Sequence, residues 1–305
     1  MTDTHQAAFG ETPPHLTALP ADYAALLKPR VMSLSIFTAL VGMVAAPGPV
    51  ANWGLAILSV IAIALGAGAS AALNMWWDSD IDGRMARTAG RPIPTGKVPA
   101  AEAFALGIVL SALSVWLLAL SGGYLAALLL AVTIGFYVVV YSMLLKRRTP
   151  QNIVIGGAAG ALPPVVGYAA VTGAAPLEAW LLFALIFMWT PPHFWALGLV
   201  KREDYEAAGI PMMPNVKGDS RTRLEILIYS VLLVAGAPLI ALSAMAGQVY
   251  LAASIALGAE FLRRAYRLYQ SADNNGAGGL FGFSIFYLFA LFLALLVEHW
   301  GGLHG

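Results

Sequence analysis

A chain of 305 residues is long enough for two ordinary soluble domains, but its composition excludes that class. Hydrophobic residues make up 59% of the chain and charged residues only 11%, whereas soluble domains carry about 45–50% and about 25%. Long apolar runs containing 31 Gly and 18 Pro favour membrane-spanning helices over a barrel of alternating strands. The absence of cysteine excludes disulfides and thiolate ligands, and the net charge of +1 gives no reason to expect a nucleic-acid partner.

The first residues of the chain contain no membrane segment. Residues 1–23 are polar and rich in turn-forming residues, which predicts a flexible cytoplasmic tail. No basic stretch followed by an apolar run occurs here, so we expect no secretory signal, and acids without Lys or Arg argue against an organelle transit peptide. These features favour a bacterial inner membrane. The predicted membrane domain covers 24–298, with a short outer tail over 299–305.

Nine segments are apolar enough to cross a hydrocarbon core of about 30 Å, which needs about 20 helical residues. They cover residues 30–46, 52–73, 101–120, 124–145, 153–172, 179–199, 224–246, 249–262 and 280–297. Pro163 and Pro164 interrupt the fifth segment. Pro191 and Pro192 predict a kink or a break in the sixth.

The basic residues orient these segments. All 17 Lys and Arg lie at or before the start of the first segment or in alternate connections, and the other connections contain none. The positive-inside rule then places the N-terminus in the cytoplasm and the C-terminus outside. The two long connections that mix acids with bases both lie on the cytoplasmic face. We therefore predict an all-α integral membrane bundle of nine helices that encloses a cavity open to the cytoplasm.

Asn74, Asp78 and Asp82, hereafter the acidic stripe, follow one another at intervals of four residues at the end of the second segment. On a helix they lie on one face, each about 6 Å beyond the last. Hard oxygen donors at a membrane boundary suit Mg²⁺, which is usually completed by substrate phosphates. The alternative is a solvated helix end, but carboxylates at membrane depth beside Trp76 and Trp77 are costly without such a partner. We therefore predict a metal and diphosphate site.

Basic side chains follow the acidic stripe and the fourth segment. Arg91, in a loop stiffened by Pro and Gly, could neutralise a diphosphate, although positive-inside orientation explains a basic loop equally well. Tyr141 and Lys146 could reach the same pocket, with Lys146 as a point charge on a phosphate oxygen. Snorkelling and topology are the alternative explanation for Lys146 and its neighbour Arg147.

A second acidic group follows the sixth segment, at Glu203, Asp204 and Glu206. Two acidic helix ends could face each other across a cavity and hold two metals, although an ordinary polar loop has the same composition. His193 is the only histidine expected at membrane depth, where an ionisable residue is a functional candidate by default. Its alternative role is a hydrogen bond that fills the gap left by the neighbouring prolines.

Six stretches of the chain carry a family resemblance. They are KPRVMSL at 28–34, NMWWDSDIDGRMART at 74–88, YSMLLKRRTPQNIVIGGAAGALPPVVGYAAVTG at 141–173, TPPHFWALGL at 190–199, DYEAAGIPMMP at 204–214 and LFGFSIFYL at 280–288. The Asn-x-x-x-Asp-x-x-x-Asp pattern resembles that of the intramembrane prenyltransferase superfamily, which joins isoprenoid diphosphates to acceptors. The stretches at 141–173 and 190–214 are similar to its haem-farnesylating branch. Where many members carry a second Asp-x-x-x-Asp, this chain has Lys201 and Tyr205.

The resemblance implies transfer of a farnesyl group from farnesyl diphosphate to a vinyl group of haem B, giving haem O for haem-copper oxidases. It further implies membrane lipid, and the next haem-modifying enzyme or oxidase assembly factors, as partners. From the residues we expect Mg²⁺ on Asn74, Asp78 and Asp82, catalytic roles for Asp78, Asp82, Lys146 and Asp204, and substrate contacts from Arg30, Arg91, Tyr141, Arg147, His193 and Tyr205. The alternatives are prenylation of a quinone precursor or a chlorophyll-type ring, and, in a different class, a transporter or a haem-handling assembly factor.

Overall fold

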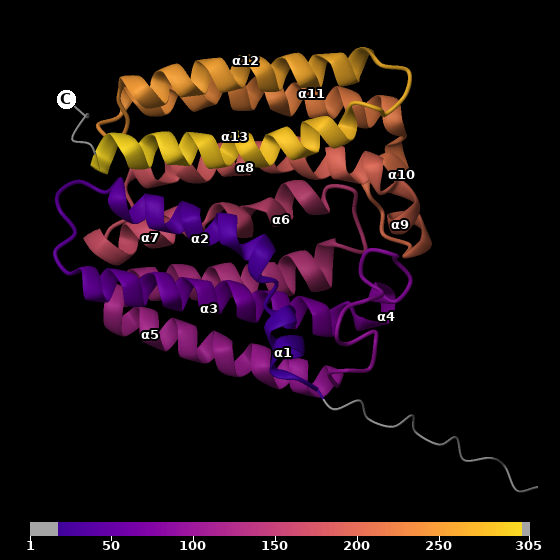
Figure 1. The fold of residues 1–305 in the computed structure, drawn as a ribbon, viewed down its shortest axis with the longest axis horizontal. Coiled ribbons are helices and arrows are strands. Elements are labelled where there is room, and N and C mark those ends of the chain that lie inside the picture. Colours follow the sequence, from indigo (N-terminus) through magenta and orange to yellow (C-terminus); the bar gives the residue numbers. More distant parts are fainter. Residues whose placement is uncertain (1–17, 301–305) are drawn as a thin grey trace, which may run out of the picture.

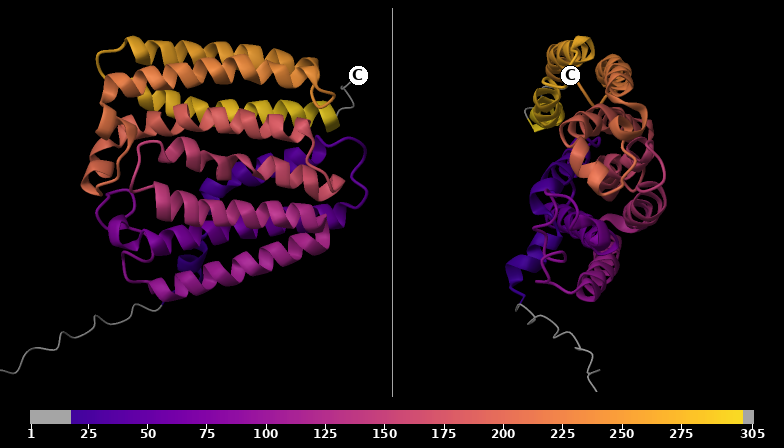
Figure 2. Two further views of the ribbon diagram at one scale, coloured as in Figure 1. Left: turned by 180° about the vertical axis from the view of Figure 1, so that it is seen from behind. Right: turned by 90° about the vertical axis from the view of Figure 1, so that its right-hand side faces the viewer.

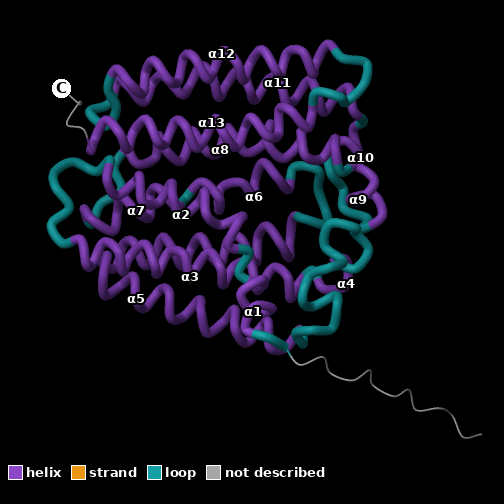
Figure 3. Tube along the Cα trace, in the orientation of Figure 1, coloured by secondary structure: helices purple, strands orange, loops and turns teal. Residues whose placement is uncertain are grey.

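The structure, a computed structural model, describes residues 18–300. Every regular element within this range is helical, and Figure 3 shows these helices joined by loops. Most of the predicted cytoplasmic tail (1–17) and the last five residues of the predicted outer tail (301–305) lie outside the described range. The first helix, α1, begins at Pro20 and therefore starts within the segment predicted as tail.

The helices follow the predicted segments closely. In chain order they are α1 (Pro20–Leu26), α2 (Pro29–Val44), α3 (Trp53–Trp77), α4 (Ser79–Asp82), α5 (Ala100–Gly135), the π-helix η1 (Phe136–Leu145), α6 (Asn152–Ala161), α7 (Pro163–Thr172), α8 (Leu177–Val200), α9 (Arg202–Ala207), α10 (Met213–Lys217), α11 (Asp219–Gly236), the 3₁₀-helix η2 (Ala237–Leu242), α12 (Gln248–Gln270) and α13 (Ala277–Trp300). Judged by length and hydropathy, six of these described segments could cross a membrane, or seven if the bent pair of α1 and α2 is one span.

The longest of these segments reverses direction in its middle. Residues 100–145 number 46, and a straight helix of that length would extend about 69 Å, roughly twice a bilayer core. At Gly123 the backbone has φ 83° and ψ 171°, which separates two helices. Glycine adopts this conformation without the steric penalty that a Cβ would bring. The two halves run side by side in opposite directions (Figure 2), as the gap between the third and fourth predicted segments required.

The two proline pairs have different consequences. Pro163 begins α7, and Leu162 separates it from α6, so the predicted interruption is confirmed. α8, by contrast, runs through Pro191 and Pro192 without a break. Its packing against α6, α11 and α13 holds the helix together, as membrane helices tolerate proline where neighbouring helices support them. The break considered for the sixth segment therefore does not occur.

Within the described part of the chain, two large apolar cores and two smaller ones stabilise the bundle. Of the two large cores, one lies among α8, α11, α12 and α13, and the other among α2, α3, α5 and α7. The outer surface of the bundle is also apolar: Trp116, Leu120 and Leu128 are about three-fifths exposed, at 59%, 61% and 61%. Soluble proteins rarely expose apolar surface on this scale, so the surface is suited to lipid rather than to water. The chain is thus a multi-pass membrane protein.

The long connections all gather at one end of the bundle. α4, α9 and α10 lie at this end in Figure 1, together with the loops that join them to the long helices. The connection between α2 and α3 lies at the opposite end, as does the C-terminal end of α13. The acidic stripe, which joins α3 to α4, therefore lies at the end that carries the long loops.

Candidate functional site

The acidic stripe keeps its helical spacing although α3 ends at Trp77. Backbone hydrogen bonds from Asp78 N to Asn74 O (3.0 Å) and from Asp82 N to Asp78 O (2.9 Å) continue the helical pattern through the junction with α4. Asn74 is 4% exposed, and Asp78 and Asp82 are completely buried. The amide Nδ2 of Asn74 donates to Asp78 Oδ2 at 2.7 Å and to Ser142 Oγ at 3.2 Å. The predicted single face is therefore confirmed, and it points into the protein.

Three cations from separate parts of the chain hold the acidic stripe. Lys146, which follows η1, pairs with Asp78 Oδ2. Arg91, in the loop after α4, donates from Nη1 to Asp82 Oδ2 at 2.6 Å. Lys28 donates from Nζ to Asn74 Oδ1 at 3.0 Å. Buried carboxylates need such partners, because an unpaired charge at this depth is unstable.

Lys28 is a site residue that the sequence reasoning did not single out. It lies between α1 and α2 and has a left-handed backbone (φ 49°), the only described non-glycine residue with a positive φ. Such a conformation is uncommon for a long side chain and often accompanies a functional position. The one signal in the sequence was the Lys-Pro-Arg stretch itself, since the fold alone brings Lys28 to a residue 46 positions away.

Arg147 lies next to Lys146 but serves a different part of the site. It donates to both oxygens of Asp80, at 2.8 and 2.7 Å, and to the carbonyl oxygen of Trp77 at 3.0 Å. Its Nη2 is also 3.5 Å from Asp78 Oδ1. The hydrogen bonds from Arg147 hold the pKa of the Asp80 carboxyl below its ordinary value. Arg147 therefore ties the end of η1 to α4, behind the acidic stripe.

A cavity of about 540 Å³ adjoins the acidic stripe: Asn74 and Asp82 line it, whereas Asp78 and Arg147 do not. Its polar end is lined by Lys28, Arg30, Asn74, Asp82, Arg87, Arg91 and Lys146, with Tyr137, Tyr141 and Tyr205 beside them. Apolar side chains of α2, α8 and α13 line the remainder, including Leu34, Ile186, Leu197, Phe281, Ile285 and Leu288. The volume is that of a small-molecule site, and the separation of a charged end from an apolar end suits an amphipathic substrate.

Close helix packing shapes the wall that carries the tyrosines. A Cβ at Gly156 would lie 2.2 Å from Cδ2 of Tyr141, so only glycine permits this approach of α6 to η1. The rings of Tyr137 and Tyr141 lie 5.3 Å apart on η1. Tyr205, on α9, lies under the guanidinium of Arg87 at 5.8 Å, and burial raises the pKa of its phenol, which therefore stays protonated at neutral pH.

The second acidic group does not complete the site. Of the predicted residues in α9, Tyr205 lines the cavity, whereas Asp204 is only partly buried and Glu203 and Glu206 are exposed. Arg30 lines the open side of the cavity and is itself exposed. The geometry therefore brings together one acidic helix end rather than two that face each other.

His193 lines the apolar part of the same cavity. Its ring stacks on Trp189, with centroids 4.2 Å apart, and on Phe281, at 4.7 Å. Nδ1 lies 2.6 Å from the hydroxyl of Ser284, on α13. The histidine is thus held by side chains of two helices, and its position beyond the acidic stripe suits contact with a bulky substrate.

The oxygen atoms of the acidic stripe fit a divalent cation. Asp78 Oδ1 and Asp82 Oδ1 are both buried and accept no hydrogen bond, although Arg147 Nη2 lies 3.5 Å from the first of them. The second oxygen of each carboxylate is paired with Lys146 or Arg91. No group of three His, Cys, Asp or Glu side chains among residues 18–300 is arranged to hold a metal, so the protein offers two carboxylates and an amide. Mg²⁺ is commonly held by one or two carboxylates together with water and substrate phosphates.

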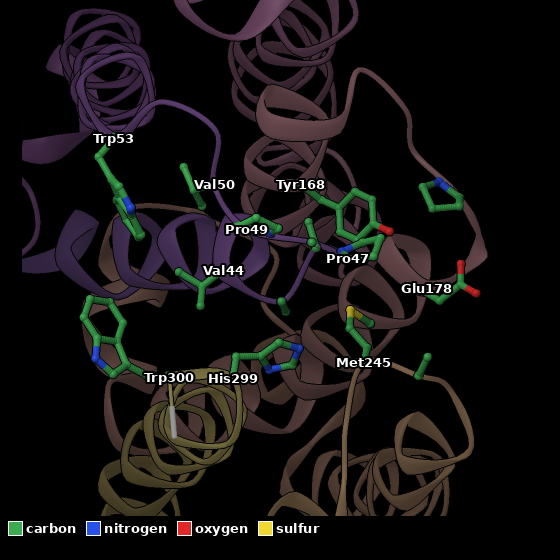
Figure 4. A pocket seen from close by; sticks show the side chains of 15 residues that line it. Val44, Pro47, Pro49, Val50, Trp53, Tyr168, Glu178, Met245, His299 and Trp300 are labelled. Carbon is green, nitrogen blue, oxygen red and sulfur yellow. The ribbon is translucent and has the colours of Figure 1, made fainter. Parts of the chain in front are cut away.

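Figure 4 shows a second pocket, at the end of the bundle that carries the connection between α2 and α3 in Figure 1. It has a volume of about 860 Å³ and is lined by the connection between α2 and α3 with Trp53, Tyr168, Met245 and Trp300. Glu178 is its only acid among the described residues, and it contains none of the predicted site residues. Of these two pockets, only the first cavity is lined by residues of the acidic stripe and the cations that bond to it.

Comparison with known proteins agrees with this geometry. The model of the UbiA prenyltransferase family matches residues 35–296. A protein named Protoheme IX farnesyltransferase from Beijerinckia indica is 60% identical over 287 residues, covering 92% of this chain and 89% of that protein. One of the same name from Parvibaculum lavamentivorans is 54% identical over 288 residues, covering 93% and 90%.

Solved structures share the fold at low sequence identity. One, from a study of digeranylgeranylglyceryl phosphate synthase, has a TM-score of 0.76 at 18% identity and covers 92% of this chain and 98% of its own. A UbiA homologue from Archaeoglobus fulgidus bound to GPP and Mg²⁺ has a TM-score of 0.68 at 20% identity and covers 89% and 99%. With the matched family model and the close relatives, these comparisons establish that the chain belongs to the UbiA prenyltransferase family.

Proposed function

We propose that this chain transfers the farnesyl group of farnesyl diphosphate to a vinyl group of haem B, giving haem O and diphosphate. One observation carries the proposal: the buried acidic stripe, surrounded by cations, lies at the charged end of a cavity whose other walls are apolar and aromatic. The names of the relatives that are 54–60% identical support the choice of both substrates.

The charged end of the cavity binds the diphosphate. Lys28, Arg91 and Lys146 bond to the acidic stripe, and Arg147 Nη2 lies 3.5 Å from Asp78, so basic side chains already surround the two carboxylates before substrate enters. Mg²⁺ bound by the acidic stripe would add charge that stabilises the departing diphosphate and so promotes ionisation of the allylic C–O bond. Fixed cations serve the same purpose, because they need no reorganisation when the charge develops.

The apolar part of the cavity holds the isoprenoid chain and the acceptor. When the C–O bond breaks, its electron pair leaves with the diphosphate, and the allylic cation is attacked by the electrons of the haem vinyl group. The new C–C bond leaves a cation on the vinyl carbon nearer the ring, and water adds there with loss of a proton to give the hydroxyethylfarnesyl group. His193 contacts the haem, and Trp189 and Phe281 help to keep water from the first cation.

We further propose that nine helices cross a bacterial inner membrane, with the N-terminus in the cytoplasm and the C-terminus outside. Within residues 18–300, hydropathy and length give seven spans when α1 and α2 count as one. Dividing residues 100–145 at Gly123 adds an eighth span, and the amphipathic helix α12 adds a ninth. The basic connections lie at the end that holds α4, α9 and α10 (Figure 1). By the positive-inside rule this end, and the charged part of the cavity with it, faces the cytoplasm.

The test is a turnover assay with the purified full-length chain in lipid, supplied with haem B, farnesyl diphosphate and Mg²⁺. We expect haem O and diphosphate in equal amounts, loss of turnover with EDTA, and recovery when Mg²⁺ is returned. Asp78→Asn should lower the rate at least about 100-fold, the scale of losing a principal electrostatic group. Glu225→Gln, which removes a partly buried acid that pairs with Arg221 on α11 and does not line the cavity, is the matched control and should keep the wild-type rate.

Other outcomes would redirect the proposal. Farnesyl transfer to an aromatic acid or a chlorophyll-type ring but not to haem would preserve the reaction and replace the acceptor. No diphosphate release with any acceptor would contradict an enzymatic role and favour transport. Equal activity of Asp78→Asn and the wild type would show that the acidic stripe is not the diphosphate site.

A further inference from the structure

Ser284 is a fully buried residue of α13 that links two helices beside the cavity. Its backbone carbonyl accepts a hydrogen bond from Trp189 Nε1 at 2.7 Å. Its hydroxyl oxygen lies 2.6 Å from Nδ1 of His193 and donates to the carbonyl oxygen of Phe281 at 2.6 Å. The serine therefore contacts the histidine and both of the aromatic residues that stack on it.

These contacts determine which nitrogen of His193 carries the proton. A serine hydroxyl has a single hydrogen, and the carbonyl of Phe281 can only accept, so that hydrogen is used on the carbonyl. With that hydrogen on the carbonyl, the contact with His193 is assigned as donation by Nδ1–H to Ser284 Oγ. In the neutral ring this leaves the lone pair on Nε2.

The remaining contacts leave Nε2 as the polar atom that can serve a ligand. Trp189 and Phe281 stack on the imidazole, with interplanar angles of 19° and 25°, and so use its faces. Phe194 meets the ring at 89°, with centroids 5.1 Å apart, and offers it no polar atom. Nδ1 is taken by Ser284, yet the residue lines the cavity. Metal-binding histidines are held in the same way, with the second ring nitrogen donating to a fixed acceptor that sets the tautomer and the ring orientation.

We propose that Ser284 is a positioning residue that holds His193 in the Nδ1–H tautomer, so that Nε2 binds the iron of the haem substrate. This inference rests on the proposed function, because it needs haem in the cavity. It assigns Ser284 to haem binding rather than to the chemistry of the diphosphate, since the serine contacts none of the charged residues described above.

The test is haem B binding by the full-length protein, followed by absorption spectroscopy and by the iron–histidine stretching band in resonance Raman spectra. The variants are His193→Gln, Ser284→Ala and Ser284→Thr. Ser254→Ala is the matched control, because Ser254 is equally buried, also donates to the carbonyl three residues earlier (2.8 Å), and lies on α12 away from the cavity lining. Haem O formation is measured for each variant in the same preparations.

We expect His193→Gln to lose the iron–histidine band. Ser284→Ala should shift or weaken the band and raise the haem Kd about tenfold, the lower end of what loss of such a supporting hydrogen bond costs. Ser284→Thr, which keeps the hydroxyl, should restore both, and Ser254→Ala should match the wild type.

The inference is overturned if Ser284→Ala keeps the wild-type band and Kd, or if Ser254→Ala weakens haem binding equally. It is also overturned if His193→Gln retains the wild-type spectrum; continued haem O formation would then leave the proposed function standing. Absence of haem O from the wild type would instead overturn the proposed function, and this inference with it.

Discussion

Lys146→Met removes the cation next to Asp78 while keeping an unbranched apolar side chain of similar length. Lys146 is 13% exposed and Asp78 is completely buried, so water replaces little of the lost interaction. The substitution affects stability and catalysis through different charges, the carboxylate of Asp78 in the first case and the departing diphosphate in the second. The two effects can therefore be separated by experiment.

The stability loss follows from the burial of the pair. At 4 Å and an effective dielectric constant of about 20, two opposite charges interact by about 4 kcal/mol, and removing one partner of a buried pair costs about 3–5 kcal/mol. Arg147 remains 3.5 Å from the other oxygen of Asp78, and Asn74 still donates to Asp78. We therefore expect the lower end, about 3 kcal/mol.

The catalytic loss is set by one charge-assisted hydrogen bond. Such bonds contribute about 1.5–3 kcal/mol, which corresponds to a decrease in kcat/KM for farnesyl diphosphate of about 10- to 150-fold. The assay is the initial rate of haem O formation at saturating haem and varied farnesyl diphosphate, with denaturant unfolding measured on the same preparations. Asp78→Asn and the double variant complete a thermodynamic cycle.

The cycle gives a specific pattern if the reasoning is correct. The double variant should be more stable than Lys146→Met, because it removes the buried carboxylate that has lost its nearest cation. It should nevertheless remain inactive, because the acidic stripe is incomplete. If Lys146→Met kept the wild-type kcat/KM, the proposed contact with the diphosphate would be refuted. If the double variant were less stable than both single variants together predict, the buried pair would not be the source of the stability effect.

Three further predictions concern packing, capping and pH. Gly156→Ala should lower the free energy of unfolding by about 1–3 kcal/mol, because the new Cβ would clash with an aromatic ring of η1. Gly135→Ala, whose Cβ meets nothing within 4 Å, should not lower it. Equal unfolding free energies for the two variants would contradict the packing argument. Glu298→Gln weakens the three hydrogen bonds that the Glu298 carboxylate accepts from backbone N–H groups at the start of α12, at 2.8, 2.6 and 3.1 Å. The free energy of unfolding should fall by about 1–3 kcal/mol, with turnover per folded molecule unchanged. A parallel loss of turnover would refute a purely structural role. Because the pKa of the Asp80 carboxyl is lowered, its bond to Arg147 stabilises the protein fully above the ordinary Asp pKa of 3.8, and this stabilisation is lost as the pH falls through the folded-state pKa. The rate of hydrogen exchange around α4 should therefore rise in acid. Asp80→Asn should abolish this pH dependence.

The sequence alone determined the membrane class, the positions of the helices and the acidic stripe. Apolar runs of about 20 residues have few alternatives to a membrane helix, because every backbone polar group must be satisfied within the bilayer. The stripe of Asn74, Asp78 and Asp82 depends only on helical periodicity, which survives the junction between α3 and α4. The roles predicted for Asp204 and the other site residues remain predictions.

Tertiary structure alone decided which distant residues meet the stripe and the cavity. Lys28 reaches Asn74 across 46 residues, Lys146 reaches Asp78 across 68, and Ser284 reaches His193 across 91. No local pattern encodes these contacts, because helices far apart in the chain become neighbours only when they pack. The continuity of α8 through its proline pair has the same origin: the local rule predicts a kink or a break, but the helices that surround α8 hold it together.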